Sequence, residues 1–174
     1  MSTLIVENLK GPTTGSNANK ITIPSGQELH AAGHVIDHKY MQYGVTTTLS
    51  SGSYTDSNLT LNVTPKSTSS KFIITYNVFF YMTLRVNGWS AAAGRILRDS
   101  TVIHTDGYSL GRGATYNYGT YVNPMFNTSD TYEDEPSTTS QITYKVQFAS
   151  YQSHTIYLHQ GNQKGFLSVT EIAQ

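Results

Sequence analysis

The stretch KFIITYNVFFYMTLRV, residues 71–86, decides the fold of this chain. From its second residue onward every other residue is apolar, and most of the residues between them are polar. Successive side chains of a strand point to opposite faces, so this period of two predicts a long β-strand with one face in a core. Ile73, Phe79 and Tyr81 depart from the pattern, because they are apolar on the otherwise polar face.

Similar alternation predicts further strands on both sides of this stretch. The expected strands are residues 35–43, 59–63, 94–97, 101–104, 142–148, 156–158 and 167–172. A turn at 66–70 leads from one of them into the long strand and predicts a hairpin, and Asp99-Ser100 predicts a second hairpin. About eight strands with turn residues between them are typical of a sandwich or barrel. We therefore predict an all-β fold, an antiparallel β-sandwich that is jelly-roll-like.

Two regions differ from this rhythm. Residues 1–34 read as an extended N-terminal arm, residues 35–174 as the sandwich body, and residues 105–132 of the body as long Tyr- and Gly-rich surface loops with room for an edge strand. The arm holds two short apolar patches that are too small to fold alone, so we expect them to pair with the body, a symmetry mate or a docking partner. The residues of these patches are Leu4, Ile5, Val6, Ile21 and Ile23.

Composition narrows the class of protein. Only 13% of the 174 residues are charged, against roughly 25% in an ordinary globular protein, and Ser, Thr, Asn, Gly and Tyr fill the difference. Such surfaces are common in fibrous, secreted and virion proteins. Eleven basic residues balance eleven acidic ones without a basic run, so nothing suggests nucleic-acid binding. The absence of cysteine excludes disulfides and thiol chemistry.

Targeting signals are not evident in the sequence. Residues 1–10 lack the basic start and apolar run of a signal peptide, and no window reaches about 18 apolar residues. We therefore expect a protein made in a cytoplasm, with no membrane insertion.

Three histidines are the candidate metal ligands. His30, His34 and His38 are spaced by four, with Asp37 beside the last, and imidazoles with a carboxylate can hold zinc or a related metal. The HExxH arrangement is absent, and ordinary surface histidines are the simpler interpretation. We predict no metal and no cofactor.

Acidic residues cluster before Pro136, at Asp130, Glu133, Asp134 and Glu135. Oxygen-rich loops bind calcium, and paired carboxylates hydrolyse glycosides. The sequence lacks the alternation of a calcium loop and places no two of these groups across a cleft. A solvated loop is the preferred interpretation, and we predict no enzymatic activity.

Aromatic residues are the candidate binding groups. Flat rings stack on sugars and also dominate protein interfaces, so a possible glycan or receptor contact involves the single tryptophan and the loop tyrosines. These residues are Trp89, Tyr108, Tyr116, Tyr118 and Tyr121. The alternative is packing in the core or between subunits. On the long strand, Phe79, Tyr81 and Met82 are candidates for an oligomer interface.

Several short segments, in this order, are similar to a known family. They are residues 4–12, 19–27, 70–74, 95–101, 134–140, 143–147 and 168–172. Together they resemble small structural proteins of tailed bacteriophages, especially marine and cyanobacterial phages; residues 89–94 and 105–127 are not covered. The resemblance implies a fibre, adaptor or head decoration in the virion, often a homotrimer, with the arm anchored to other virion proteins. It carries over no catalytic residue. A receptor-binding module that recognises host surface polysaccharide is the alternative.

Overall fold

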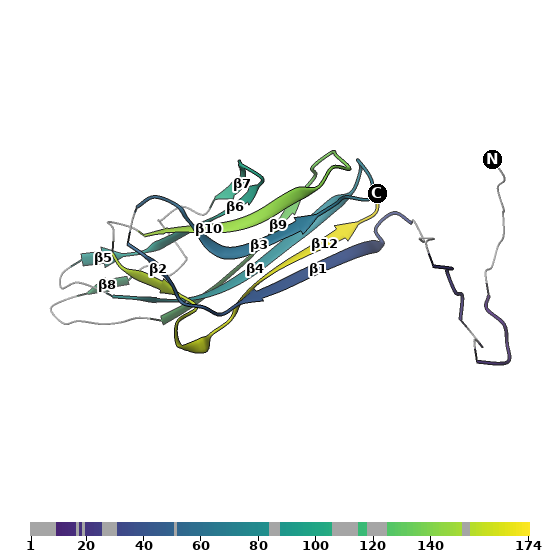
Figure 1. Cartoon of the computed structure of the whole chain (residues 1–174), viewed down its shortest axis with the longest axis horizontal. Coiled ribbons are helices and arrows are strands. Elements are labelled where there is room, and N and C mark those ends of the chain that lie inside the picture. The colour runs from purple at the N-terminus through teal and green to yellow at the C-terminus, as the bar shows by residue number, and fades with distance from the viewer. Residues whose placement is uncertain are drawn as a thin grey trace.

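The structure is a computed structural model of the chain. It describes residues 10–16, 18, 20–25, 31–50, 52–83, 88–105, 115–117, 125–150 and 154–174, with backbone alone for 88–90 and 115–117. Within these residues the chain is almost entirely strand (Figure 1). The elements are β1 (Val35–Tyr43), β2 (Thr47–Leu49), β3 (Thr55–Val63), β4 (Lys71–Met82), β5 (Gly88–Ser90), β6 (Ala92–Arg98), β7 (Thr101–Thr105), β8 (Thr115–Asn117), β9 (Met125–Asp134), β10 (Ile142–Ser150), β11 (Ile156–Leu158), the 3-10 turn η2 (Gln160–Asn162) and β12 (Gly165–Ile172).

Two antiparallel sheets form a sandwich. The first sheet contains β1, β2, β4, β9, β11 and β12, and the second has the order β3-β10-β6-β7. In the first sheet β11 continues the line of β12, because both pair with β4, one after the other. β2 likewise continues the line of β1, because β1 pairs with β12 and β2 pairs with β11. Each sheet therefore has four strand positions.

The pairing is that of a jelly roll. β1 pairs with β12, β3 with β10, β4 with β9 and β6 with β7, which is the order of a long antiparallel ribbon wrapped into two sheets. The predicted sandwich is confirmed. The predicted β6–β7 hairpin is also confirmed, with Asp99 in the left-handed conformation at its turn.

The predicted hairpin between residues 59–63 and the long strand is wrong. β3 pairs with β10 in the second sheet, whereas β4 lies in the first, so the segment between them crosses from one sheet to the other. Glu171 holds this crossing, because its buried carboxylate accepts a hydrogen bond from the Lys66 N–H at 2.6 Å. The alternation of apolar and polar residues shows which side of a strand is buried but does not identify the neighbouring strand. The prediction of a hairpin depended only on the short turn between the two strands, and for that reason it failed.

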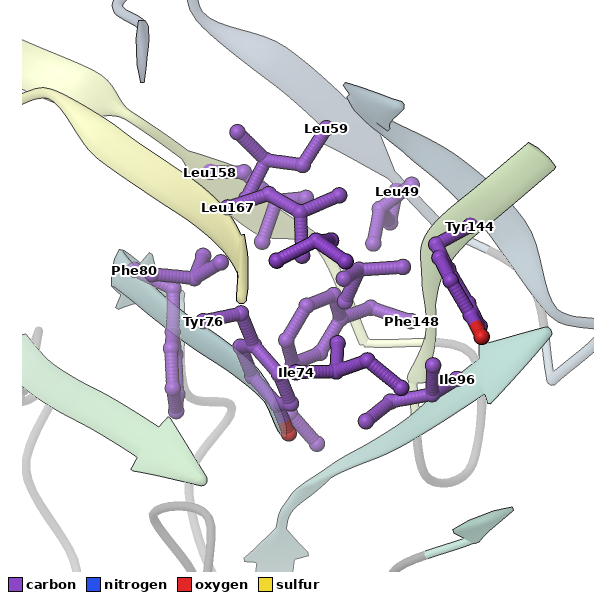
Figure 2. Packing of buried hydrophobic residues seen from close by; sticks show 14 of the residues in the cluster. Leu49, Leu59, Ile74, Tyr76, Phe80, Ile96, Tyr144, Phe148, Leu158 and Leu167 are labelled. Atoms are coloured by element: carbon purple, nitrogen blue, oxygen red, sulfur yellow. The ribbon is translucent and has the colours of Figure 1, made fainter. Parts of the chain in front are cut away.

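The core lies between the two sheets (Figure 2). Along β4 buried and half-buried residues alternate without a break, as the sequence predicts. Figure 2 shows Ile74 and Tyr76 of β4 packed near Phe148 of β10 and Ile96 of β6. Burying side chains of this size stabilises the fold by about 1.5–3 kcal/mol each.

The two regions that the sequence sets apart differ in the structure. The described residues 10–16, 18 and 20–25 lie away from the sandwich in Figure 1, and within them Ile21 and Ile23 are 50% and 41% exposed. The patch Leu4, Ile5 and Val6 lies outside the described residues. The end of the region 105–132 belongs to β9, the kind of edge strand for which the prediction left room.

Candidate functional site

Among the candidate metal ligands, the structure describes His34 and His38 and does not place them in a metal site. His38 is exposed on β1; its Nδ1 lies 2.9 Å from the Thr170 hydroxyl, and its N–H donates to the Asp37 carboxylate. His34 lies just before β1, and His30 is outside the described residues. Among the residues that the structure describes, no group of three His, Cys, Asp or Glu side chains is arranged to hold a metal.

Three of the four acidic residues, Asp130, Glu133 and Asp134, lie in β9 and not in a solvated loop, which corrects that interpretation. Because side chains alternate along β9, Glu133 points outward and Asp134 inward. Outside, the Lys71 ammonium lies 2.9 Å from both Glu133 and Glu135, and these carboxylates raise the pKa of Lys71. Glu133 and Asp134 thus lie on opposite faces of the sheet and do not face each other as a glycosidase pair would.

Asp134 connects the two sheets. The Arg98 Nη1 of β6 donates to both of its oxygens, at 2.8 and 2.9 Å, and the Tyr144 hydroxyl of β10 donates to one at 2.7 Å. Burial first, and then the Asp134 carboxylate, raise the pKa of Tyr144. The phenol therefore stays a hydrogen-bond donor. This arrangement clamps one end of the sandwich and is fully occupied by internal partners.

His159 is a second buried polar group, and it lies where β11 gives way to β12. Its Nδ1 accepts the Gly165 N–H at 3.1 Å, its Nε2 lies 3.3 Å from the Ser57 carbonyl oxygen, and its ring meets Tyr43 edge-on. Burial lowers the pKa of His159, against the smaller opposite effect of the Ser57 carbonyl. The ring is a neutral plug between the strands and is not a free acid or base.

The outer face of the first sheet is the surface with a distinctive chemistry. Aromatic pairs lie across neighbouring strands there: Tyr40 with Phe166 at 5.6 Å between ring centroids, and Tyr81 with Tyr157 at 5.7 Å. Phe79 shares the face of Tyr81, since both alternate with buried residues of β4. We call the set Tyr40, Phe79, Tyr81, Met125, Tyr157 and Phe166 the aromatic face. It includes two of the three residues predicted for an oligomer interface.

The prediction for the third residue, Met82, is wrong. Met82 is 0% exposed and belongs to the core, because it has the same parity along β4 as the buried Phe80. The sequence analysis also missed Tyr40, Met125, Tyr157 and Phe166. A usable signal was present: Tyr157 lies between buried Ile156 and Leu158, so an aromatic residue out of phase with an apolar pattern marks an outward position.

The outer face of the second sheet has the opposite character. Gln147 connects Arg95 and Asp56 through hydrogen bonds of 2.8 and 2.5 Å, and the Lys145 ammonium lies 3.2 Å from Asp56. Such a network of charges and amides is suited to water. The two outer faces therefore differ: one carries a polar network and the other carries rings.

The loop aromatics are described in part. Residues 88–90 and 115–117 pair as β5 and β8, with Trp89 opposite Tyr116 in the backbone register. Tyr108, Tyr118 and Tyr121 lie outside the described residues. The backbone pairing brings together two segments that are far apart in the sequence.

Comparison with known proteins gives distant structural neighbours. No model of a known protein family and no curated protein matches the chain. Solved structures of infectious bursal disease virus match this chain at low identity. The crystal structure of its VP2 subviral particle matches with TM-score 0.37 and 15% identity, over 94% of this chain and 46% of the VP2 chain. The T13 viral particle matches with TM-score 0.36 and 12% identity over 91% and 41%. The chain thus spans less than half the length of these neighbours. In the described residues we find no helix long and apolar enough to cross a membrane.

Proposed function

We propose that this chain is a non-enzymatic structural protein of a bacteriophage virion, a tail, fibre or capsid-attached component that assembles as a homotrimer. The observation that carries the proposal is the jelly-roll body with a separate extended arm, in a chain whose ordered segments resemble small phage structural proteins. Its work is mechanical: the arm attaches to other virion proteins, and the body projects outward.

The state of the polar residues supports a mechanical role. The carboxylate of Asp134 is held by Arg98 and Tyr144, and Glu171 holds a chain crossing. Groups committed in this way stabilise a fold and do not act on a substrate.

The arm is the part we assign to particle attachment. Ile21 and Ile23 are two residues apart in an extended segment, so they share one side of the backbone, and both are substantially exposed. Exposed branched residues on an extended segment suit strand addition to a neighbouring protein.

Incorporation into particles tests this assignment. We expect the protein in purified phage particles by mass spectrometry and immunogold labelling, and we expect Ile21→Asp with Ile23→Asp to remove it from them. The matched control is Thr13→Asp with Thr14→Asp, two exposed arm residues that receive the same added charge. Absence of the wild-type protein from particles would refute the virion role. Equal incorporation of both variants would refute anchoring through these isoleucines.

Receptor binding is the second candidate. It is favoured by the β5–β8 pairing, which joins the Trp89 segment to the Tyr116 segment in one small sheet. This candidate predicts saturable binding to host surface polysaccharide that is lost in Trp89→Ala and Tyr116→Ala. Isothermal titration with purified host polysaccharide measures it, and no heat of binding from the wild-type protein would exclude it.

A further inference from the structure

The outward positions of the first sheet can be read from its pairing register. Across the sheet, Tyr157 of β11 lies beside Tyr81 of β4, which lies beside Met125 of β9. Two outward positions before Tyr81 along β4 is Asn77, which lies beside Phe166 of β12. Phe166 in turn lies beside Gln42 of β1. The aromatic face thus runs from one edge strand of the sheet to the other.

The side chains of the aromatic face are more exposed at its two edges than in its middle. Tyr40 is 50% exposed and Met125 is 65% exposed, and they lie on the edge strands β1 and β9. Between them Phe79 and Tyr81 are half-buried by their own neighbours. The aromatic face is therefore partly covered in its middle and exposed at its two ends.

Charge is scarce on this surface. Between Tyr40 and Met125 the outward strand positions that the structure describes carry aromatic, Met, Ser, Thr, Asn or Gln side chains. The nearest acid, Glu133, lies toward one end and is already paired with Lys71. Enrichment in aromatic residues and Met, with depletion of charge, is the composition of the centre of a protein interface.

The outer face of the first sheet is large enough for a stable contact. Four strand positions at about 4.8 Å and the twelve residues of β4 at about 3.3 Å each give roughly 750 Å² for the whole outer face of this sheet, of which the aromatic face is the uncharged part. A standard interface takes about 800 Å² from each partner. The formal net charge of zero leaves no overall repulsion between identical chains.

We infer that the aromatic face is where copies of this chain pack against one another. The inference rests on the proposed homotrimeric assembly and names the surface that forms it. A second copy is the occupant because the outer face of the first sheet approaches the area that a standard interface takes from each partner, and because the chain has no net charge to repel its own copies. The polar outer face of the second sheet, with its Asp56–Lys145 pair, is left in water.

The test places charge on the exposed ends of the face without touching the core. Tyr40→Lys with Met125→Lys adds two positive charges on edge strands of the first sheet. The matched control, Thr60→Lys with Val102→Lys, adds two at exposed positions on β3 and β7, the edge strands of the second sheet. Circular dichroism and the urea midpoint establish that each variant folds, and Met125→Lys alone serves as a milder third variant.

Sedimentation equilibrium over a range of concentrations gives the result. We expect the wild type and the control to sediment at a multiple of 19.2 kDa, and the double variant to sediment at 19.2 kDa, with a dissociation constant raised at least about 100-fold by like charges at the contact. Met125→Lys alone raises it by about 10-fold. A double variant that assembles like the wild type overturns the inference, as does a wild type that is monomeric throughout. Polysaccharide binding by a monomeric wild type, lost in the double variant, also overturns it and assigns the face to sugar.

Failure of this inference is separable from failure of the proposed function. A monomeric protein that is still present in particles refutes the aromatic contact and leaves the virion role. An assembled protein that is absent from particles refutes the virion role and leaves the contact.

Discussion

Asp134→Asn tests whether the buried clamp between the sheets stabilises the sandwich. The substitution keeps the shape of the side chain but removes the negative charge that accepts hydrogen bonds from Arg98 and Tyr144. Removing one partner of a buried ion pair costs about 3–5 kcal/mol, because the other charge is left without compensation. The Arg98 side chain is 26% exposed and can reach water, so we expect a loss of about 2–3 kcal/mol in the free energy of unfolding.

Urea unfolding followed by circular dichroism measures this loss. For a chain of this length the same change lowers the melting temperature by roughly 5–10 °C. Glu133→Gln is the matched control, since it is the neighbouring residue and its side chain is 50% exposed; we expect a change within about 0.5 kcal/mol. Tyr144→Phe removes one charge-assisted hydrogen bond and should cost about 1–2 kcal/mol.

A double-mutant cycle separates the clamp from the effects of each residue alone. If Tyr144 and Asp134 act through their hydrogen bond, the losses in the double variant sum to less than those of the two single variants by at least about 0.5 kcal/mol. An Asp134→Asn variant that loses less than about 1 kcal/mol would refute the reasoning, because the carboxylate would then contribute no more than a surface ion pair.

Two further predictions concern the His159 plug. Because burial lowers the pKa of His159, the unfolded state takes up the proton first; stability from this group is full above the unfolded pKa of about 6.5 and is lost as pH falls below it, by at most about 1.4 kcal/mol per pH unit. Urea unfolding at pH 7 and pH 5 checks this, and a His159→Gln variant with the same pH dependence as the wild type would contradict it. Gly165→Ala should cost about 1–3 kcal/mol, because a Cβ there would lie 2.8 Å from the His159 Nδ1 and 2.9 Å from the Asn77 carbonyl oxygen. Thermal melting beside Gly52→Ala, where a Cβ would meet its nearest atom at 3.7 Å, provides the comparison, and equal melting temperatures would count against the crowding.

Much of the fold was accessible from the sequence because each strand buries one face. The alternation of β4 and β10 predicts both the strands and their buried sides, and Asp99-Ser100 predicts the hairpin turn. β9 was harder to find, because its edge position leaves it rich in Thr, Ser, Asn and Asp, with Thr128 and Asp134 as its buried residues. Polar residues between the inward Phe126 and Tyr132 interrupt the hydrophobic period of this strand.

The candidate surface was less accessible, because its residues come from several strands. Phe79 and Tyr81 were visible from their phase within one strand, but Phe166 joins them only through the register of β12 on β4. Asp134 shows the same limit: its partners Arg98 and Tyr144 lie in the other sheet. Periodicity gives the orientation of a side chain, whereas the pairing order of a jelly roll gives its neighbours.

That pairing order also explains why a polar plug lies inside the sandwich. The first sheet is interrupted twice at the same level, between β1 and β2 and between β12 and β11, where Tyr43 opposes Gly165 and Thr47 opposes Leu158. Interrupted strands leave backbone groups without ladder partners, and burying such groups costs free energy. His159 meets this need, because its N–H donates to the Phe79 carbonyl oxygen and its ring accepts the Gly165 N–H. His159 thus supplies one backbone bond to Phe79 and one side-chain bond to Gly165 where the strands are interrupted, so these backbone groups stay paired inside the sandwich.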